Sequence, residues 1–430
     1  MPRTEARHGR GRRVTLLAAG AFVAVAAAGT MAVAWRPSIL PIPPPPRTAF
    51  APDPVARGAT LAAVGDCAVC HTAEGGQPFA GGRPLATPFG TIFTTNITPD
   101  PDSGIGAWPE AAFSRAMREG VGRDGRHLYP ALPYTHFTRA TDADIAGLYA
   151  FLMTRTPVQA TAPPPRLPFP LNVRATLAGW NLLFLDPGPW QPDPTHDAEW
   201  NRGAYLVEGV GHCGACHTPR NGLGAERSGR ALAGGEADGW HAPALDATSP
   251  ARIAWTVDAL TTYLHTGFDG NHGAAAGPMG PVTQNLARVP EADVRAIALY
   301  IAAQNPAAAG SDTQPARPAE RAVAGDPVFA GACGGCHAAD APMTRAGAPS
   351  LALSTAVNAP TSRNTVNVVL HGIPFREGVP APFMPGFGAS LSNEQVAGVV
   401  RYLRQRFSDR PAWTDVDERV RQARQEGTQG

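Results

Sequence analysis

Cys67-Ala68-Val69-Cys70-His71 is the first copy of a pattern that occurs three times in this 430-residue chain. The other copies are Cys213-Gly214-Ala215-Cys216-His217 and Cys333-Gly334-Gly335-Cys336-His337, and together they use all 6 cysteines. Two thiols three residues apart lie on one side of a helical turn, where they can add to the two vinyl groups of a porphyrin. The histidine that follows then reaches the iron. The sequence therefore predicts three covalently bound haem c groups, attached at Cys67, Cys70, Cys213, Cys216, Cys333 and Cys336 and ligated by His71, His217 and His337.

Other uses of paired cysteines fit this pattern less well. Structural disulfides, zinc knuckles and thioredoxin-like redox pairs do not require a histidine directly after the second cysteine. Histidine is rare in this chain, 12 of 430 residues, so three such neighbours are not expected by chance.

The three motifs open three related units, which we call the first, second and third repeat. The repeats cover residues 55–156, 196–304 and 322–408. A proline-rich tether at 36–54 precedes them, linkers at 157–195 and 305–321 separate them, and a polar tail at 409–430 follows. Each repeat ends in a stretch of helical apolar spacing, at 144–152, 293–301 and 395–403. Thr141 and Ser392 stand where helix N-caps are expected. The sequence predicts an all-α fold of three tandem haem-binding domains after an N-terminal hydrophobic helix, with a solvated helix in the tail.

The N-terminus predicts export. A cluster of arginines precedes an uncharged apolar stretch at 14–35. That length favours a retained signal-anchor, although the small residues at Ala32-Val33-Ala34 also suit cleavage of a signal peptide. Because the arginines stay inside, both alternatives place the repeats at the periplasmic face of a bacterial inner membrane. The net charge is only +1 and no strongly basic face follows the arginines, so no nucleic-acid partner is expected.

The sixth iron ligand must come from later in each repeat. Methionine is a common choice in cytochromes c, and Met279 and Met384 precede the closing helices of the second and third repeats at similar distances. The first repeat has Leu132 at that place, and leucine cannot bind iron. His136 is the nearest substitute. A five-coordinate iron and the more distant Met117, His127 and Met153 remain alternatives.

From about residue 56 to 406 the chain resembles the tri-haem cytochrome c subunits of membrane-bound periplasmic dehydrogenases. The resemblance is carried by the three motifs, by residues 87–100 (Thr-Pro-Phe-Gly-Thr-Ile-Phe-Thr-Thr-Asn-Ile-Thr-Pro-Asp), by His127-Leu128-Tyr129-Pro130 and by residues 178–184 (Ala-Gly-Trp-Asn-Leu-Leu-Phe). It implies partners that oxidise alcohols, gluconate or aldehydes. Leu132 and residues 267–273 look like the subgroup that serves molybdenum hydroxylases, which implies a molybdopterin-dependent partner acting on an aldehyde or an N-heterocycle.

Composition agrees with a cofactor-filled interior. Glycine (47) and proline (45) make up about a fifth of the chain, while aromatic residues are only 7%. Few large side chains are available to fill three cores, so each haem is expected to complete one. We expect electron transfer from a dehydrogenase to ubiquinone or another cytochrome. The alternatives are a haem enzyme with an open first iron, performing peroxidase-like or small-gas chemistry, and a soluble periplasmic shuttle. Trp180 with Leu182, Leu183, Phe184 and Leu185 is interpreted as core between the first two repeats, with a docking surface for the catalytic subunit as the alternative.

Overall fold

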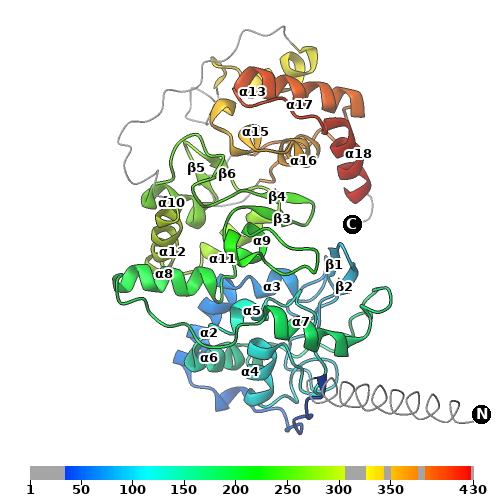
Figure 1. The fold of residues 1–430 in the computed structure, drawn as a ribbon, viewed down its shortest axis with the longest axis vertical. Helices are drawn as coiled ribbons and strands as arrows, with labels where there is room; N and C mark the ends of the chain where they lie inside the picture. The colour runs from blue at the N-terminus through cyan, green and yellow to red at the C-terminus, as the bar shows by residue number, and fades with distance from the viewer. Residues whose placement is uncertain (1–33, 306–325, 343–349, 376–382, 428–430) are drawn as a thin grey trace, which may run out of the picture.

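The structure is a computed structural model, and it describes residues 34–305, 326–342, 350–375 and 383–427. Within these ranges no helix has both the length and the apolar character needed to span a membrane. Of the expected hydrophobic segment at 14–35, all but Ala34 and Trp35 lies outside the described residues, as does most of the linker at 305–321. The three repeats are stacked along the long axis of the molecule, from the blue and cyan first repeat to the red end of the third (Figure 1).

The first repeat contains five helices and one hairpin. In chain order these are α2 (Pro52–Val64), α3 (Cys67–Cys70), β1 (Pro84–Thr87), β2 (Gly90–Phe93), α4 (Glu110–Glu119), α5 (Tyr134–Phe137) and α6 (Asp142–Met153). The linker to the second repeat forms α7 (Leu177–Phe184). The second repeat contains α8 (Ala198–Glu208), α9 (Gly214–His217), β3 (Gly235–Ala237), β4 (Trp240–Ala242), α10 (Val257–Thr266), β5 (Phe268–Asp269), β6 (Gly273–Ala274), α11 (Met279–Leu286) and α12 (Glu291–Ala303).

In the described part of the third repeat, a π-helical turn covers Phe329–Cys333. It continues with α13 (Gly334–His337), α15 (Thr355–Asn358), α16 (Arg363–His371), α17 (Asn393–Phe407) and α18 (Val416–Gly427). The helices expected at the end of each repeat are present as α6, α12 and α17. Their predicted caps are confirmed, because the Thr141 hydroxyl accepts from the amide of Asp144 and Ser392 forms a capping box with Gln395.

In the described ranges, three two-stranded antiparallel hairpins interrupt the helical pattern, and the all-α prediction did not include them. The β3–β4 hairpin turns at Asp238 and Gly239, which both have positive φ, 46° and 75°. Asp-Gly is the usual sequence of such a two-residue turn, since both residues tolerate the left-handed region. The larger elements are helical, so the fold is predominantly α with short hairpins between helices.

The first and last helices of the first two repeats cross at van der Waals contact. A Cβ atom added at Gly58 of α2 would lie 1.9 Å from the carbonyl oxygen of Gly147 in α6. A Cβ atom at Gly203 of α8 would lie 1.9 Å from the carbonyl oxygen of Ala296 in α12. Only glycine permits this approach of two backbones. In the third repeat, the ring of Phe329 packs instead on Tyr402 of α17, with 5.0 Å between centroids.

The described residues form two hydrophobic cores. One is shared by the first two repeats and includes side chains from α2, α6, α8 and α12. The other belongs to the third repeat. It also contains Trp413, Val416, Val420 and Ala423, so the expectation of a solvated polar tail needs correction. Val416, Val420 and Ala423 are spaced to lie on one side of α18, which docks that side against α16 and α17.

Gly203 provides a test of the helix crossing. Replacing Gly203 with alanine places a methyl group against a backbone carbonyl that cannot rotate away, so we expect the free energy of unfolding to fall by about 3 kcal/mol. Gly179 in α7 is the matched control, because nothing lies within 4 Å of its added Cβ atom. Gly179→Ala should leave stability unchanged or raise it by up to about 1 kcal/mol. Thermal unfolding followed by circular dichroism measures both; equal effects would contradict the close crossing.

Candidate haem-binding sites

Each Cys-x-x-Cys-His motif lies on or next to a single helical turn, which is α3, α9 or α13. In the first two repeats the motif histidine is anchored by a backbone carbonyl. The Nδ1 atom of His71 donates to the carbonyl of Thr95 over 2.7 Å, and Nδ1 of His217 donates to the carbonyl of Pro243 over 2.7 Å. A carbonyl can only accept, so the proton is on Nδ1 and Nε2 keeps its lone pair. This hydrogen bond orients a histidine for iron, and the residues therefore fit a haem.

The six cysteines range from buried, as Cys333 is, to exposed, as Cys70 and Cys336 are. All six are free of disulfide bonds in the structure. Burial is the main cause that raises the pKa of Cys67 and of Cys213 to about 12 each, and it raises the pKa of Cys333 to about 11. Catalytic and metal-binding cysteines instead have lowered pKa values. Among the described residues, no three His, Cys, Asp or Glu side chains gather as a metal site. An apolar setting suits thioether bonds to a porphyrin edge.

The two expected methionine ligands occupy ordered backbone. Met279 is the first residue of α11 and is half-buried against the shared core. Met384 pairs with Ile373 through two backbone hydrogen bonds, of 2.8 and 3.0 Å. Leu132 precedes α5 and packs against the same core as Met279. Leu132 lies two residues before α5, which contacts α4, and Met279 begins α11, which contacts α10.

His136 is turned toward the second repeat. Its Nδ1 atom lies 2.8 Å from the carbonyl oxygen of Glu208, and its Nε2 atom lies 2.8 Å from a carboxylate oxygen of Glu226. It would have to give up one of these bonds to bind iron. The sequence offered no signal for this contact, because Glu226 is distant in the chain.

The other candidate ligands of the first repeat are buried. Met117 and Met153 lie in the shared core. His127 donates from Nε2 to the carbonyl of Ala34 over 3.0 Å, while its buried Nδ1 atom has no hydrogen-bond partner among the described residues.

The first two motifs face one another across the contact between their repeats. His212, directly before Cys213, donates from Nε2 to the carbonyl of Gly65 over 3.1 Å. Arg83 and Asp238 form an ion pair of 3.3 Å next to both motifs. Burial, then the charges of nearby groups that include Cys216, raises the pKa of Cys70 to about 11. The two attachment sites are therefore close enough to influence each other electrostatically.

The third repeat is joined to the second through the β3–β4 hairpin. The Asn364 side chain of α16 accepts from the amide of His241 and donates to its carbonyl, over 2.8 Å each. Asn367 donates to the carbonyl of Gly239 over 3.1 Å. The Asp-Gly turn signal at 238–239 could have predicted the hairpin, but not what docks on it.

Comparison with known proteins identifies the family to which the chain belongs. A family model described as Cytochrome c matches residues 55–156, and one described as Cytochrome C oxidase, cbb3-type, subunit III matches residues 320–403. The fructose dehydrogenase cytochrome subunit of Gluconobacter japonicus is 35% identical, over 90% of this chain and 86% of its own length. The gluconate 2-dehydrogenase cytochrome c subunit of Pantoea cypripedii is 37% identical, over 81% of this chain and 85% of its own. The chain belongs to the family of cytochrome c subunits of dehydrogenases.

One subunit of the nicotinate dehydrogenase of Pseudomonas putida is similar to this cytochrome at 49% identity. The match covers 94% of the present chain, which spans only 35% of that relative. The resemblance that the sequence motifs indicated is therefore confirmed at the level of the family.

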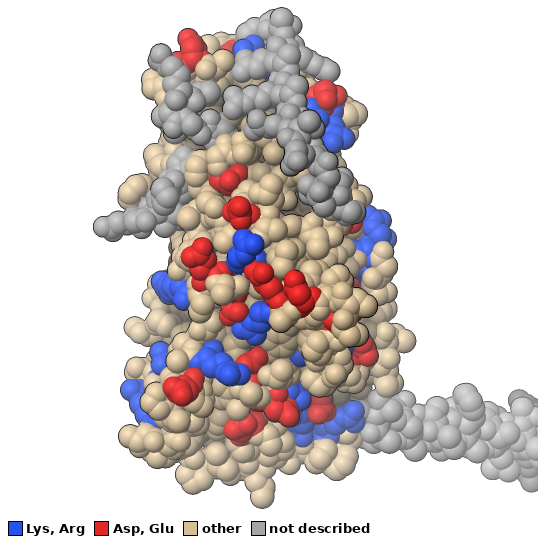
Figure 2. All heavy atoms as spheres, turned by 90° about the vertical axis from the view of Figure 1, so that its left-hand side faces the viewer, with Lys and Arg blue, Asp and Glu red and all other residues tan. Residues whose placement is uncertain are grey.

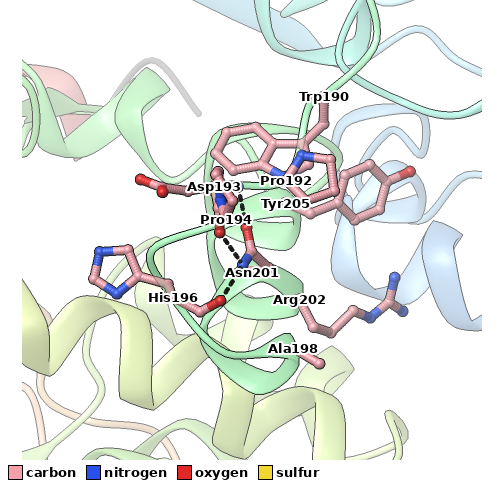
Figure 3. Close-up of a pocket in the computed structure, with 9 residues that line it drawn as sticks. All are labelled: Trp190, Pro192, Asp193, Pro194, His196, Ala198, Asn201, Arg202 and Tyr205. Carbon is pink, nitrogen blue, oxygen red and sulfur yellow. Dashed lines mark hydrogen bonds between the residues drawn. The ribbon is translucent and has the colours of Figure 1, made fainter.

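The cytochrome subunit also has an open pocket of about 460 Å³ between the linker and α8. Figure 3 shows that Trp190, Pro192, Pro194 and Tyr205 line it. Two of its polar side chains are engaged within the chain. Asn201 donates to the carbonyls of Asp193 and His196, and Arg202 forms two 2.8 Å bonds with Asp293. The indole nitrogen of Trp190 is buried and has no hydrogen-bond partner among the described residues. The pocket is a junction of linker and helix.

The His136–Glu226 pair predicts a pH-dependent contribution to stability. Burial alone would lower the pKa of His136, but the hydrogen bond and charge of Glu226 outweigh it and raise that pKa. The pKa of Glu226, which burial would raise, is lowered by His136. The stabilisation by His136 is complete below the pKa of unfolded histidine, about 6.5, and is lost as pH rises through the raised folded value. The stabilisation by Glu226 is complete above about 4.3 and is lost as pH falls through the lowered folded value.

We expect His136→Gln to lower the free energy of unfolding by about 1–2 kcal/mol near pH 5.5 and by less near pH 8.5. Glutamine keeps a hydrogen-bond donor and removes the charge. Unfolding at both pH values, with a Glu226→Gln variant and the double variant as controls, checks the coupling. Equal losses at the two pH values would show that the charge of this pair does not stabilise the contact.

Proposed function

We propose that this cytochrome subunit carries three haem c groups and passes electrons from a periplasmic dehydrogenase to ubiquinone or another cytochrome. The observation that supports it most is the repeated motif on single helical turns, with His71 and His217 held by carbonyls so that Nε2 is available to iron. Haem iron supplies one-electron chemistry by alternating between its ferric and ferrous states.

Each proposed haem domain uses its own residues to hold the group. The cysteine pairs attach it, and His71, His217 and His337 are the proposed proximal ligands. Met279 and Met384 are the proposed sixth ligands of the second and third sites, because a methionine ligand raises the reduction potential. The shared core and facing motifs of the first two repeats support transfer between their haems, since both attachment turns lie at one contact.

The proposed partner oxidises an N-heterocycle or an aldehyde. The 49% identical relative carries the name nicotinate dehydrogenase, and nicotinate is an N-heterocyclic acid. This supports the sequence-based expectation of a molybdopterin-dependent partner over partners that act on sugars or alcohols. Substrate oxidation would then belong to the partner, and this chain would receive the electrons. The proposed site of assembly is the periplasmic face of the inner membrane, with residues 14–35 as the attachment.

The haem count and the source of electrons can be measured on one preparation. We expect the intact mass and the pyridine haemochrome absorbance to give three haems per chain. A Cys213→Ala/Cys216→Ala variant should lose one third of the haem. Addition of the partner's substrate to the purified complex should reduce the haems, whereas the isolated chain should stay oxidised. Fewer than three haems, or reduction without a partner subunit, would overturn the proposal.

A second candidate function is favoured by Leu132. It takes the place of a methionine ligand, and His136 is bonded at both ring nitrogens. A first iron without a sixth protein ligand would bind a small neutral molecule such as carbon monoxide. The chain would then perform small-gas or peroxidase-like chemistry at that site, in addition to electron transfer.

Reciprocal substitutions at Leu132 and Met279 distinguish a first iron with a sixth protein ligand from a first iron with an open sixth position. We expect the reduced wild-type protein to bind about one carbon monoxide per three haems, because ferrous haem with an open position binds it rapidly. Leu132→Met should reduce carbon monoxide binding toward zero, and the matched Met279→Leu should raise it to about two molecules per three haems. Absorbance spectra of the reduced protein with and without carbon monoxide measure this. If the wild type binds none, the first iron has a sixth protein ligand and the second candidate fails.

A further inference from the structure

The linker between the first two repeats carries large apolar side chains on its outer surface. Half of the large apolar side chains that the described residues expose belong to this one segment. They are Phe169 (81% exposed), Leu171 (38%), Val173 (42%), Leu182 (70%) and Leu183 (70%). We call these five side chains the linker surface. Exposed apolar side chains gathered in one place mark an interaction site more often than scattered ones do.

The chain holds this surface outward. On the inner side of α7, Asn181 accepts a 2.7 Å hydrogen bond from the Tyr134 hydroxyl and donates to the carbonyl of Glu119 over 3.1 Å. The indole nitrogen of Trp180 donates to the carbonyl of Leu223 over 3.0 Å. These bonds fix the rotation of α7 about its axis. Leu182 and Leu183 therefore cannot turn inward without breaking them.

The linker surface lies near Ala34. His127 donates to the carbonyl of Ala34 over 3.0 Å, and Arg174 donates to the carbonyl of His127 over 2.9 Å. Two residues later, the Tyr129 hydroxyl donates to the carbonyl of Leu171 over 3.0 Å. One short segment thus bonds to both Ala34 and the linker surface.

The flanking side chains are those of a membrane interface. Trp35 is exposed, and the guanidinium of Arg174 lies 4.4 Å from the centre of the Tyr129 ring. Arg126 is also largely exposed. Tryptophan, tyrosine and arginine beside exposed leucines are typical of protein surfaces at the lipid headgroups. Ala34 is moreover the end of the uncharged stretch for which the sequence predicts a membrane segment, which favours lipid over a protein partner.

We propose that the linker surface rests in the headgroup region of a lipid bilayer, next to the point where residues 14–35 enter it. The inference rests on the membrane attachment proposed above. The contact of the linker surface with the headgroups gives the anchored chain a second attachment to the membrane and so orients the first repeat toward the bilayer.

The sequence contains no lysine, which permits a direct test. A single introduced lysine becomes the one side-chain amine in the full chain. Leu183→Lys places it in the linker surface, and Phe169→Lys is a second variant of the same surface. Phe375→Lys is the matched control, since Phe375 is 71% exposed and follows α16 in the third repeat, at the other end of the molecule. The haem-loaded variants are reconstituted in phosphatidylethanolamine and phosphatidylglycerol vesicles and treated with a membrane-impermeant biotin ester.

We expect biotin labelling at Leu183→Lys and Phe169→Lys to be about fivefold lower in vesicles than in detergent, relative to the Phe375→Lys control, because the headgroups cover the amine. Equal labelling in vesicles and detergent would overturn the proposal. Protection that appears only when the dehydrogenase subunit is present would also overturn it, since a protein would then cover the surface. A chain that does not float with the vesicles would refute the attachment as well, while the haem count and substrate-dependent reduction test electron transfer separately.

Discussion

The close crossing of the first and last helices determines where the first two haem-binding motifs lie. Gly58 meets the backbone of Gly147, and Gly203 meets that of Ala296, so no side chain separates the paired helices. Each motif follows the first of these helices within a few residues, and the short connection leaves its cysteines little freedom. The carbonyls of Thr95 and Pro243 then orient the histidines. In the third repeat, rings of Phe329 and Tyr402 replace the glycine contact and the motif begins in a π-helical turn.

Contacts between the repeats pack them against one another. The first two share a hydrophobic core, and Asp144 of the first accepts a hydrogen bond from the Tyr205 hydroxyl of the second. The third is joined through polar contacts of α16 with the β3–β4 hairpin. This difference suits the proposed relay, because transfer between the first two haems would occur within one packed body. Charges of both signs are interspersed over the face shown in Figure 2, and most of that face is uncharged.

Local sequence rules predicted what depends on neighbouring residues. The motif turns, the closing helices and the caps at Thr141 and Ser392 follow from spacing and from hydrogen bonds within a few residues. The β3–β4 turn carried a local signal too, Asp-Gly at 238–239, which the all-α prediction did not use. The burial of one side of α18 could be recognised only from its contacts with α16 and α17. Val416 and Val420 in a highly charged helix do not by themselves predict a buried side. The sequence could not indicate that both ring nitrogens of the candidate ligand His136 lie at hydrogen-bond distance from groups of the second repeat.

The sequence by itself determined the chemistry of attachment. A pair of cysteines followed directly by histidine indicates covalent haem, because thioether formation and iron ligation need only residues on one helical turn, and three such motifs predict three haems. It also showed that Leu132 stands where the second repeat has the candidate ligand Met279. The tertiary structure alone decided which repeats share a core, that His136 serves the contact with Glu226, and that Leu182 and Leu183 face outward beside Ala34. Those properties depend on groups distant in the chain, and packing selects among many arrangements that local spacing permits equally.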